Sequence, residues 1–349
     1  MRYHLECTQC GEIFENSYGS QICSKCNGIL EVVYEGKMSK IKEISSFWDM
    51  EKILPEGRYR HFYLGNTPMI KSIEKSLWLK LEFMNPTHSF KDRGSVIEIS
   101  KAREYGYNEV VCASTGNMAY SIAYYAKLYG IKARIFISGN ANKDKVNDIR
   151  SVGDATITQI SGDFNAAQNL AVKYSEKKGA FLCGDYCYRK EGQKTIVYEI
   201  MRSKPDIENI IVPVGNATLL SATYKAIREM KGSGQIGKTP RIIAVQSEKC
   251  MPFVSAFLKK TGIKYEKPET KADAIAVGYP TYGKQGLEAL KETFGKAVAV
   301  SEKSMALEQK LFLENYGMAV ELASVAAIAA YKKLGIKSSS VAVITGANI

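Results

Sequence analysis

The sequence predicts an α/β protein with two domains, each a parallel twisted sheet flanked by helices, and a small metal-binding ribbon in front of them. Three observations favour this fold class. Short apolar segments alternate with longer amphipathic ones, which is typical of parallel sheets with helices on both faces. The 349 residues exceed what one ordinary core needs. Two CxxC pairs stand close together near the N-terminus.

The two cysteine pairs predict the ribbon. Cys7 and Cys10 form one pair, Cys23 and Cys26 the other, with twelve residues between them. Each pair can present two thiolates from one tight turn, so the four can close a tetrahedral site that suits zinc, or iron in its place. A closed site leaves no position for a substrate, and its role would be structural. Disulfides within the pairs are the alternative, which a cytosolic setting disfavours.

The alternation of strands and helices begins after the ribbon. Residues 31–60 predict a linker with one helix, and residues 64–69 a turn. Beyond them the pattern predicts strands at 77–83, 109–114, 133–138, 155–160, 209–214, 241–246 and 341–345. It predicts helices after Lys91 and at 118–130, 143–153, 164–179 and 219–232. In such folds ligands bind beyond the carboxyl ends of the strands, so the residues that follow strands are the candidates for function.

Composition narrows the class of protein. The net charge is +12, but the lysines are spread along the chain without a long basic run. A nucleic-acid binder would concentrate such charge, so a zinc-ribbon protein that binds nucleic acid without catalysis is kept only as the alternative of another class. No apolar run is long enough to cross a membrane, and no secretion signal is seen. We therefore expect a cytoplasmic protein without membrane or nucleic-acid partners.

Lys91 is the candidate for reactive chemistry. It lies in NPTHSFKDRGS (85–95), a polar loop between a predicted strand and the start of a predicted helix. A lysine at such a place can be a Schiff-base residue, and the helix N-terminus favours anionic ligands. The chain has three histidines, too few to favour a Ser-His-Asp set or a histidine metal site. His88 either contacts cofactor or substrate or packs in the loop.

Small polar residues follow three other strands. The segment 114–117 (STGN) and the segment 215–219 (GNATL) each open a helix, where backbone amides and the helix dipole favour a phosphate or carboxylate. Thr345 follows the last strand and can aim a hydroxyl at the same edge. A lysine, two anion sites and a hydroxyl are what pyridoxal phosphate needs from a protein.

These motifs resemble those of the threonine synthase family, pyridoxal-phosphate enzymes with the fold of the tryptophan synthase β-subunit (fold type II). The resemblance covers nearly the whole chain and follows the family's order. It rests on the CxxC ribbon and on GNTPM (65–69), NPTHSFKDRG (85–94), CASTGN (112–117), RKEGQKTIVYEI (189–200), VPVGNATLL (212–220), ELASVAA (321–327) and the terminal TG. SFKDRG together with ASTGN and VPVGN is the most specific part.

The resemblance implies a role for each matching residue. Lys91 would carry the cofactor and shuttle protons, with Phe90 before it, Asn117 would contact the ring hydroxyl, and Thr345 would face the pyridine nitrogen. The cofactor phosphate would be held by Gly215, Asn216, Ala217, Thr218 and Leu219. The substrate would be contacted by Ser114, Thr115, Arg189, Lys194 and His88.

The resemblance also implies the domains and the reaction. We expect a zinc ribbon at 1–36, a large cofactor-phosphate domain at 37–84 and 191–349, and a smaller movable domain at 85–190 that carries the Schiff-base lysine. The expected reaction is that of a carbon–oxygen lyase, from O-phospho-L-homoserine and water to L-threonine and phosphate. The family suggests a homodimer.

Departures from the family pattern leave the substrate open. The family usually has Gly where this chain has His88, a second Gly where it has Thr218, and Asn-Pro where it has Tyr186, Cys187 and Tyr188. They motivate an alternative to the expected reaction, a β-replacement on O-phosphoserine with sulfide or sulfite as nucleophile. His88 and Tyr188 are the candidates for selecting the nucleophile.

Overall fold

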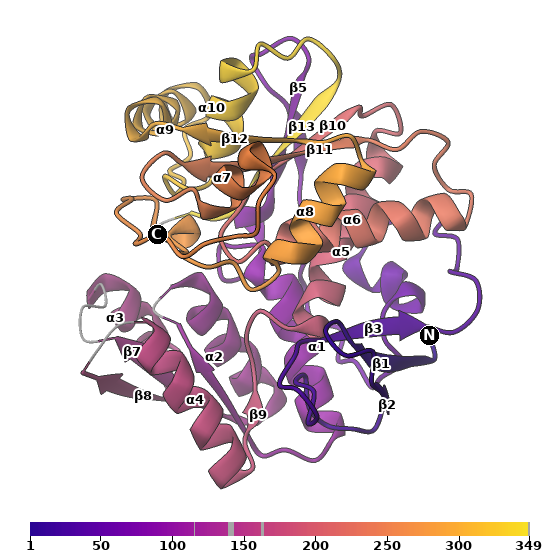
Figure 1. Cartoon of the computed structure of the whole chain (residues 1–349), viewed down its shortest axis with the longest axis vertical. Coiled ribbons are helices and arrows are strands. Elements are labelled where there is room, and N and C mark those ends of the chain that lie inside the picture. Colours follow the sequence, from indigo (N-terminus) through magenta and orange to yellow (C-terminus); the bar gives the residue numbers. More distant parts are fainter. Residues whose placement is uncertain (115, 139–142, 162–163, 348–349) are drawn as a thin grey trace. The chain divides into compact units, whose positions relative to one another are not determined.

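The structure, a computed structural model, describes residues 1–114, 116–138, 143–161 and 164–347 (Figure 1). The chain divides into two compact units. Unit 1 consists of Met1–Lys37, Met50–Leu64 and Lys91–Gln193. Unit 2 consists of Met38–Asp49, Gly65–Phe90 and Lys194–Ile349. The predicted ribbon thus groups with the segment that carries Lys91, and so does 50–64, which we expected in the large domain.

The N-terminal part of unit 1 is a small antiparallel sheet of order β2-β1-β3. Its strands are β1 (Tyr3–Cys7), β2 (Ile13–Glu15) and β3 (Leu30–Tyr34). Tyr3, Leu5 and Cys7 alternate with partly exposed residues along β1 and are all buried, so one face of this strand packs inward. The predicted linker therefore begins as a strand, and its one helix is the 3-10 helix η1 (Phe47–Ile53).

The rest of unit 1 is a parallel sheet of order β8-β7-β6-β9. Its strands are β6 (Glu109–Ala113), β7 (Lys132–Ser138), β8 (Ala155–Ile160) and β9 (Phe181–Leu182). Its helices are α1 (Lys91–Glu104), α2 (Asn117–Tyr129), α3 (Lys143–Ser151), α4 (Phe164–Lys178) and α5 (Cys187–Ser203), the last of which continues into unit 2. Helix α4 packs on β6 and β7 through Ala167 and Ala171, which contact Val111 and Phe136 in one apolar cluster.

Unit 2 is built on a six-stranded sheet of order β12-β11-β10-β13-β5-β4. All neighbours are parallel except β4, which runs antiparallel to β5 at the edge. The strands are β4 (Met69–Lys71), β5 (Leu77–Leu81), β10 (Asn209–Pro213), β11 (Arg241–Ser247), β12 (Lys296–Val300) and β13 (Ser340–Ile344). The helices are α6 (Thr218–Gly232), α7 (Pro252–Lys259), α8 (Gly283–Glu292), α9 (Glu302–Tyr316), α10 (Ala326–Lys333) and the 3-10 helices η2 (Glu82–Met84) and η3 (Asp273–Ile275).

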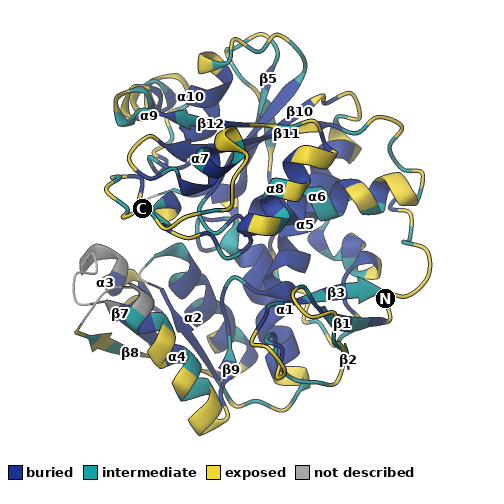
Figure 2. Ribbon diagram, in the orientation of Figure 1, coloured by how far each residue is buried: buried dark blue, intermediate teal, exposed yellow. Residues whose placement is uncertain are grey.

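The central strands of unit 2 are buried on both faces, as Figure 2 shows. All five residues of β10 and of β13 are buried, which is why they read as continuous apolar runs instead of alternating ones. Helix α10 packs on β10 to β13, and α6 and α8 pack on β11. The predicted strands and helices all form, but strand 77–83 ends at Leu81, where η2 begins.

Helices α1 and α5 cross in unit 1 with almost no space between their backbones. A Cβ on Gly192 would lie 1.8 Å from the carbonyl oxygen of Arg93, and a Cβ on Gly94 would lie 2.5 Å from Cγ of Arg189. Only glycine fits at these two positions. The crossing brings Arg189 against the first turn of α1, the turn that begins with Lys91.

Replacing Gly192 by Ala should destabilise unit 1, because the new methyl group meets a backbone atom that side-chain motion cannot move away. We expect a loss of about 1–3 kcal/mol or more in the free energy of unfolding, measured by urea denaturation. Gly232→Ala is the control, because that helical glycine has nothing within 4 Å of its Cβ position. An unchanged midpoint for Gly192→Ala would contradict the close crossing.

Candidate active site

Lys91 is the first residue of α1, and its side chain is 20% exposed. Its Nζ lies 3.7 Å from Oδ1 of Asp185, whose side chain is 8% exposed. Burial lowers the pKa of Lys91, while the carboxylates of Asp185 and Glu98 act in the opposite direction and Arg189 lowers it further. A lysine with a lowered pKa carries more neutral amine near pH 7, and the neutral amine is the form that acts as a nucleophile and accepts a proton.

Arg189 and Glu98 form a fully buried ion pair next to Lys91. The guanidinium of Arg189 also donates through Nη1 to the carbonyl oxygen of Lys91 (3.2 Å), and through Nε to that of Gly184 (2.8 Å). Glu98 accepts the backbone N–H of Gly184 at 3.0 Å. Burial raises the pKa of Glu98, which Arg189 opposes. The pair holds the start of α1 in place.

Helix α2 begins beside α1 in the same unit. Ser121 of α2 donates to the carboxylate of Asp92, the residue after Lys91, at 2.6 Å. Ser114 follows β6, is buried, and accepts the backbone N–H of Gly116 at 3.3 Å. Asn117 is the first residue of α2 and is half-buried. Thr115, a predicted substrate contact, lies outside the described residues.

The predicted phosphate loop lies in unit 2, between β10 and α6. A Cβ on Gly215 would lie 3.0 Å from the carbonyl oxygen of Ala274, so the backbone there is closely packed. Asn216 accepts the hydroxyl of Thr281 at 3.1 Å. Ala217 has φ +61°, a strained conformation for a residue with a side chain, and α6 begins at Thr218. A turn that opens a helix directs backbone N–H groups toward the helix N-terminus, as a phosphate site requires; Leu219 continues the helix.

Thr345 follows β13 in the same unit and is held by Ser324. The two hydroxyl oxygens lie 3.0 Å apart, and Ser324 also donates to the carbonyl oxygen of Gly346 at 2.7 Å. The carbonyl oxygen of Thr345 accepts the backbone N–H of Phe90 at 3.0 Å. The chain that leads into Lys91 is therefore fixed to the end of β13.

His88 lies in that same segment with φ +57°. The left-handed region suits glycine, the residue that the family resemblance led us to expect at this position, and histidine is among the residues that tolerate it. The backbone carbonyl of His88 accepts the N–H of Ala347 at 3.0 Å. The imidazole is half-buried, and burial lowers its pKa.

Three residues have surroundings that favour other roles than the predicted ones. Arg189 is fully buried and bonded as described. Lys194 is fully buried and paired with Glu229 at 2.9 Å. The hydroxyl of Tyr188 lies in a buried cluster, 2.6 Å from that of Tyr105. These contacts favour roles in positioning and packing. Contact with the substrate therefore stays a prediction for Arg189 and Lys194. The buried hydroxyl of Tyr188 makes this residue a poor candidate for selecting the nucleophile.

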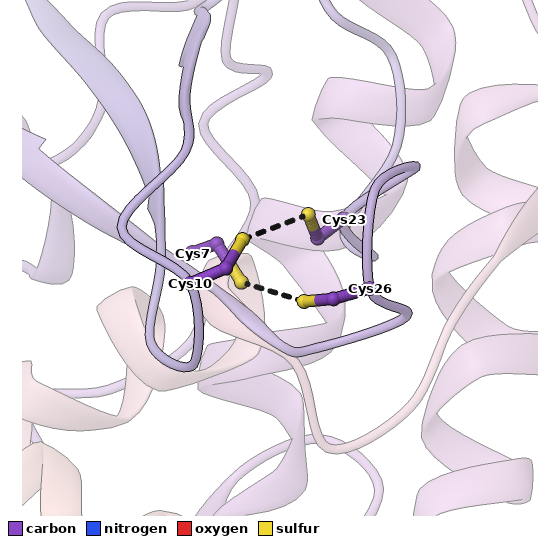
Figure 3. Close-up of side chains that lie close together, drawn as sticks. All are labelled: Cys7, Cys10, Cys23 and Cys26. Atoms are coloured by element: carbon purple, nitrogen blue, oxygen red, sulfur yellow. Dashed lines mark hydrogen bonds between the residues drawn. The ribbon is translucent and has the colours of Figure 1, made fainter.

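The four ribbon cysteines converge in unit 1, as Figure 3 shows. Their Sγ atoms all lie within 4.8 Å of one another, with Cys7 and Cys26 at 3.5 Å and Cys10 and Cys23 at 3.7 Å. All four are free thiols. A tetrahedral zinc with bonds of about 2.3 Å places its sulfurs about 3.8 Å apart. The cluster therefore has the dimensions of a four-cysteine metal site.

Comparison with known proteins assigns the chain to a family. The model of the family described as pyridoxal-phosphate dependent enzyme matches residues 61–346. The chain belongs to this family. It is 36% identical to the threonine synthase of Methanosarcina acetivorans over 95% of this chain and 87% of the relative, and 34% identical to that of Methanocaldococcus jannaschii over 94% and 86%. The family resemblance predicted from the motifs is confirmed.

Solved structures agree on the fold. Maize serine racemase superposes with a TM-score of 0.73 at 24% identity, covering 82% of this chain and 89% of that one. The processed form of threonine deaminase isoform 2 from Solanum lycopersicum superposes with a TM-score of 0.70 at 24% identity, covering 82% and 85%. The predicted α/β class of fold type II is confirmed. None of the helices in the described ranges is long and apolar enough to cross a membrane.

The residues of this chain fit the cofactor of its family. An amine with a lowered pKa, a strained turn that opens a helix and a buried hydroxyl are all present. Sequence reasoning missed Asp185, Glu98 and Ser324. Ser324 lies within the ELASVAA motif, so a signal for it existed. Asp185 and Glu98 carried none, because an acidic residue in a loop or a helix is usually a solvated one.

Asp185→Asn should shift the chemistry of Lys91 to lower pH. The carboxylate favours the ammonium form of Lys91, so its removal lowers the pKa of the amine further and leaves more of it neutral. We expect the cofactor to attach to the apo-protein severalfold faster at neutral pH, with the acid limb of the pH profile moved to lower pH. Stopped-flow absorbance measures this. Asp154→Asn, an exposed aspartate of the same unit, is the control; an unmoved profile for Asp185→Asn would refute the interaction.

Proposed function

We propose that this protein is a threonine synthase, which converts O-phospho-L-homoserine and water to L-threonine and phosphate. The observation that supports it most is the 36% identity to a threonine synthase over 95% of the chain. The geometry supports the same chemistry, since Lys91, the strained turn at Ala217 and the Thr345 hydroxyl match the needs of pyridoxal phosphate.

Each residue of the site has its own part in this reaction. The amine of Lys91 would hold the cofactor and would take and return protons at the substrate carbons. The cofactor, when bound, supplies the electron sink that makes those protons acidic. Backbone N–H groups of 215–219 would hold its phosphate, Asn117 would contact its ring hydroxyl, and Thr345 would be a neutral partner for its ring nitrogen. Ser114, Thr115 and His88 contact the substrate.

A second reaction is favoured by one observation, the imidazole of His88 where the family usually has glycine. A side chain at this position changes the space and the hydrogen bonds offered to the nucleophile. The alternative is therefore β-replacement on O-phosphoserine with sulfide or sulfite. The same assay separates the two reactions.

The assay incubates the purified protein and pyridoxal phosphate with O-phospho-L-homoserine, or with O-phospho-L-serine plus sulfide or sulfite, and quantifies amino-acid products and phosphate. We expect threonine and phosphate in equal amounts from phosphohomoserine. Lys91→Ala should lower turnover at least about 100-fold, because it removes the acid–base group, while exposed Lys173→Ala should not. Borohydride reduction and peptide mapping should label Lys91. Cysteine or cysteate as the main product would replace the proposal with its alternative, and a label on another lysine would overturn the site.

The cysteine cluster is proposed to hold one structural zinc ion. The backbone nitrogens of Gln9 and Lys25 lie 3.5 Å and 3.4 Å from the Sγ atoms of Cys7 and Cys23, and such donors stabilise metal-bound thiolates.

We further propose a cytoplasmic homodimer whose segment 85–190 moves to exclude bulk water. The net charge is dispersed, so no nucleic-acid partner is proposed.

Metal analysis should find about one zinc ion per chain, the number that one four-cysteine site holds. Cys26→Ser should lose it and lower the melting temperature, because a zinc thiolate bond is lost, while Cys250→Ser, outside the cluster, should keep it. Inductively coupled plasma mass spectrometry measures the metal. Finding iron in place of zinc would change the identity of the ion and leave the proposed site as it is. Disulfides between these cysteines in protein purified under reducing conditions would contradict the metal site.

A further inference from the structure

Gln21 lies in the loop between the two cysteine pairs, yet its side chain is 2% exposed. Its Nε2 donates to Oε1 of Glu98 at 3.3 Å and to the carbonyl oxygen of Leu182 at 3.0 Å. Its Oε1 accepts the backbone N–H of Tyr188 at 3.1 Å. Both donors face acceptors and the acceptor faces a donor, so the amide is satisfied in one orientation only.

These bonds connect the ribbon to the groups around Lys91. Glu98 receives Gln21 on the oxygen that also accepts Gly184, and its other oxygen binds Arg189. Arg189 in turn donates to the carbonyl oxygen of Lys91. The N–H of Tyr188 belongs to the first turn of α5, where backbone donors have no partner within the helix. Gln21 thus caps α5 and holds Glu98 at once.

The backbone of Gln21 is held by the second cysteine turn. Its carbonyl oxygen accepts the N–H of Leu30 at 3.2 Å. Ile22 pairs with Ile29 in an isolated bridge, and Cys23 donates its N–H to Gly28 at 2.8 Å. Residues 23–28 are too polar and too few to keep this turn by burial alone, so closure of the four-thiolate site would stabilise it.

We propose that Gln21 is a positioning residue that couples the four-cysteine site to Lys91 through Glu98 and Arg189. This rests on the proposed function only for the role of Lys91. When the cysteine turn loosens, Gln21 moves away. The buried carboxylate of Glu98 then loses one hydrogen-bond donor, and the first turn of α5 loses its cap. The ion pair is then held less firmly, and so is the backbone carbonyl of Lys91 that Arg189 binds. The net electrostatic effect of Asp185, Glu98 and Arg189 on the amine of Lys91 also changes.

The direction of the effect follows from these charges. The hydrogen bond from Gln21 lowers the pKa of Glu98 against the effect of burial. Without it Glu98 binds a proton more readily, and its negative charge, which favours the ammonium form of Lys91, is reduced. The positive charge of Arg189 is then less compensated by Glu98, and it further disfavours the ammonium form of Lys91. Loss of the Gln21 contact therefore makes Lys91 react at lower pH.

The test uses Gln21→Met, which keeps the side-chain volume and removes both donors and the acceptor. Gln9→Met is the control, because it changes an exposed side chain of the first cysteine turn and keeps the backbone N–H that faces Sγ of Cys7. The readout is the rate at which acetic anhydride labels Lys91 in the cofactor-free protein as a function of pH, followed by mass spectrometry. We expect Gln21→Met to keep its metal and its folded state, and to label severalfold faster at neutral pH, whereas Gln9→Met matches the wild type.

A chelator provides the second arm. Removing the metal from wild-type protein should move the labelling profile toward that of Gln21→Met, and should move the profile of Gln21→Met little, because the link is already cut. An unmoved profile in folded, metal-bound Gln21→Met overturns the proposal. Equal shifts on chelation in both proteins overturn it too, since the coupling then runs elsewhere. The labelling needs no turnover, so failure of the proposed reaction in the product assay is distinguishable from failure here.

Discussion

The buried ion pair of Arg189 and Glu98 is the interaction on which the lysine side of the site depends. Two charges without solvent exposure are costly, and their attraction offsets that cost only when the remaining donors and acceptors are bonded. Here Gly184, Ser95, Gln21 and the carbonyl oxygen of Lys91 complete the set. Removing one partner would leave the other charge buried and unpaired, at a cost of about 3–5 kcal/mol. The close approach of α1 and α5 at Gly94 and Gly192 makes the pairing possible, so both glycines are required for the contact of Arg189 with the first turn of α1.

This arrangement also sets the reactivity of Lys91. Burial favours the neutral amine and Asp185 favours the ammonium, and the effect of burial is the larger of the two. A residue that first bonds to a cofactor and then exchanges protons needs both forms within reach of neutral pH. The backbone of Lys91 is held by Arg189 while its side chain remains partly exposed. A backbone held by Arg189 and a partly exposed side chain suit the proposed role of Lys91 as carrier of the cofactor.

Strands and helices with strong patterns were predictable from the sequence, and contacts between them were not. The buried strands 209–214 and 341–345 formed within a residue of their predicted limits, because continuous apolar runs bounded by polar turns have few other interpretations. Strand β4 was missed because three residues carry no period. The cysteine cluster was predictable because ligand spacing is local. The buried ion pair of Arg189 and Glu98 was not predictable, since the two residues lie 91 positions apart and no local pattern joins them. Gln21 stayed hidden for the same reason, as its partners lie 77 and 161 residues away.

The identity of residue 88 requires a reason other than the backbone. With φ +57°, glycine would be accommodated there without the steric cost that a Cβ brings. Histidine can adopt this φ value, but the backbone alone gives no reason for histidine instead of glycine. What the side chain adds is an imidazole whose pKa is lowered by burial, which is therefore neutral near pH 7 and both donates and accepts hydrogen bonds. It belongs to a segment whose backbone is fixed to the end of β13 at Phe90 and Ala347, so the ring is presented from a rigid support. A neutral ring held in this way is suited to orient a water molecule or to restrict the size of an entering nucleophile, which supports the hypothesis that His88 selects the nucleophile.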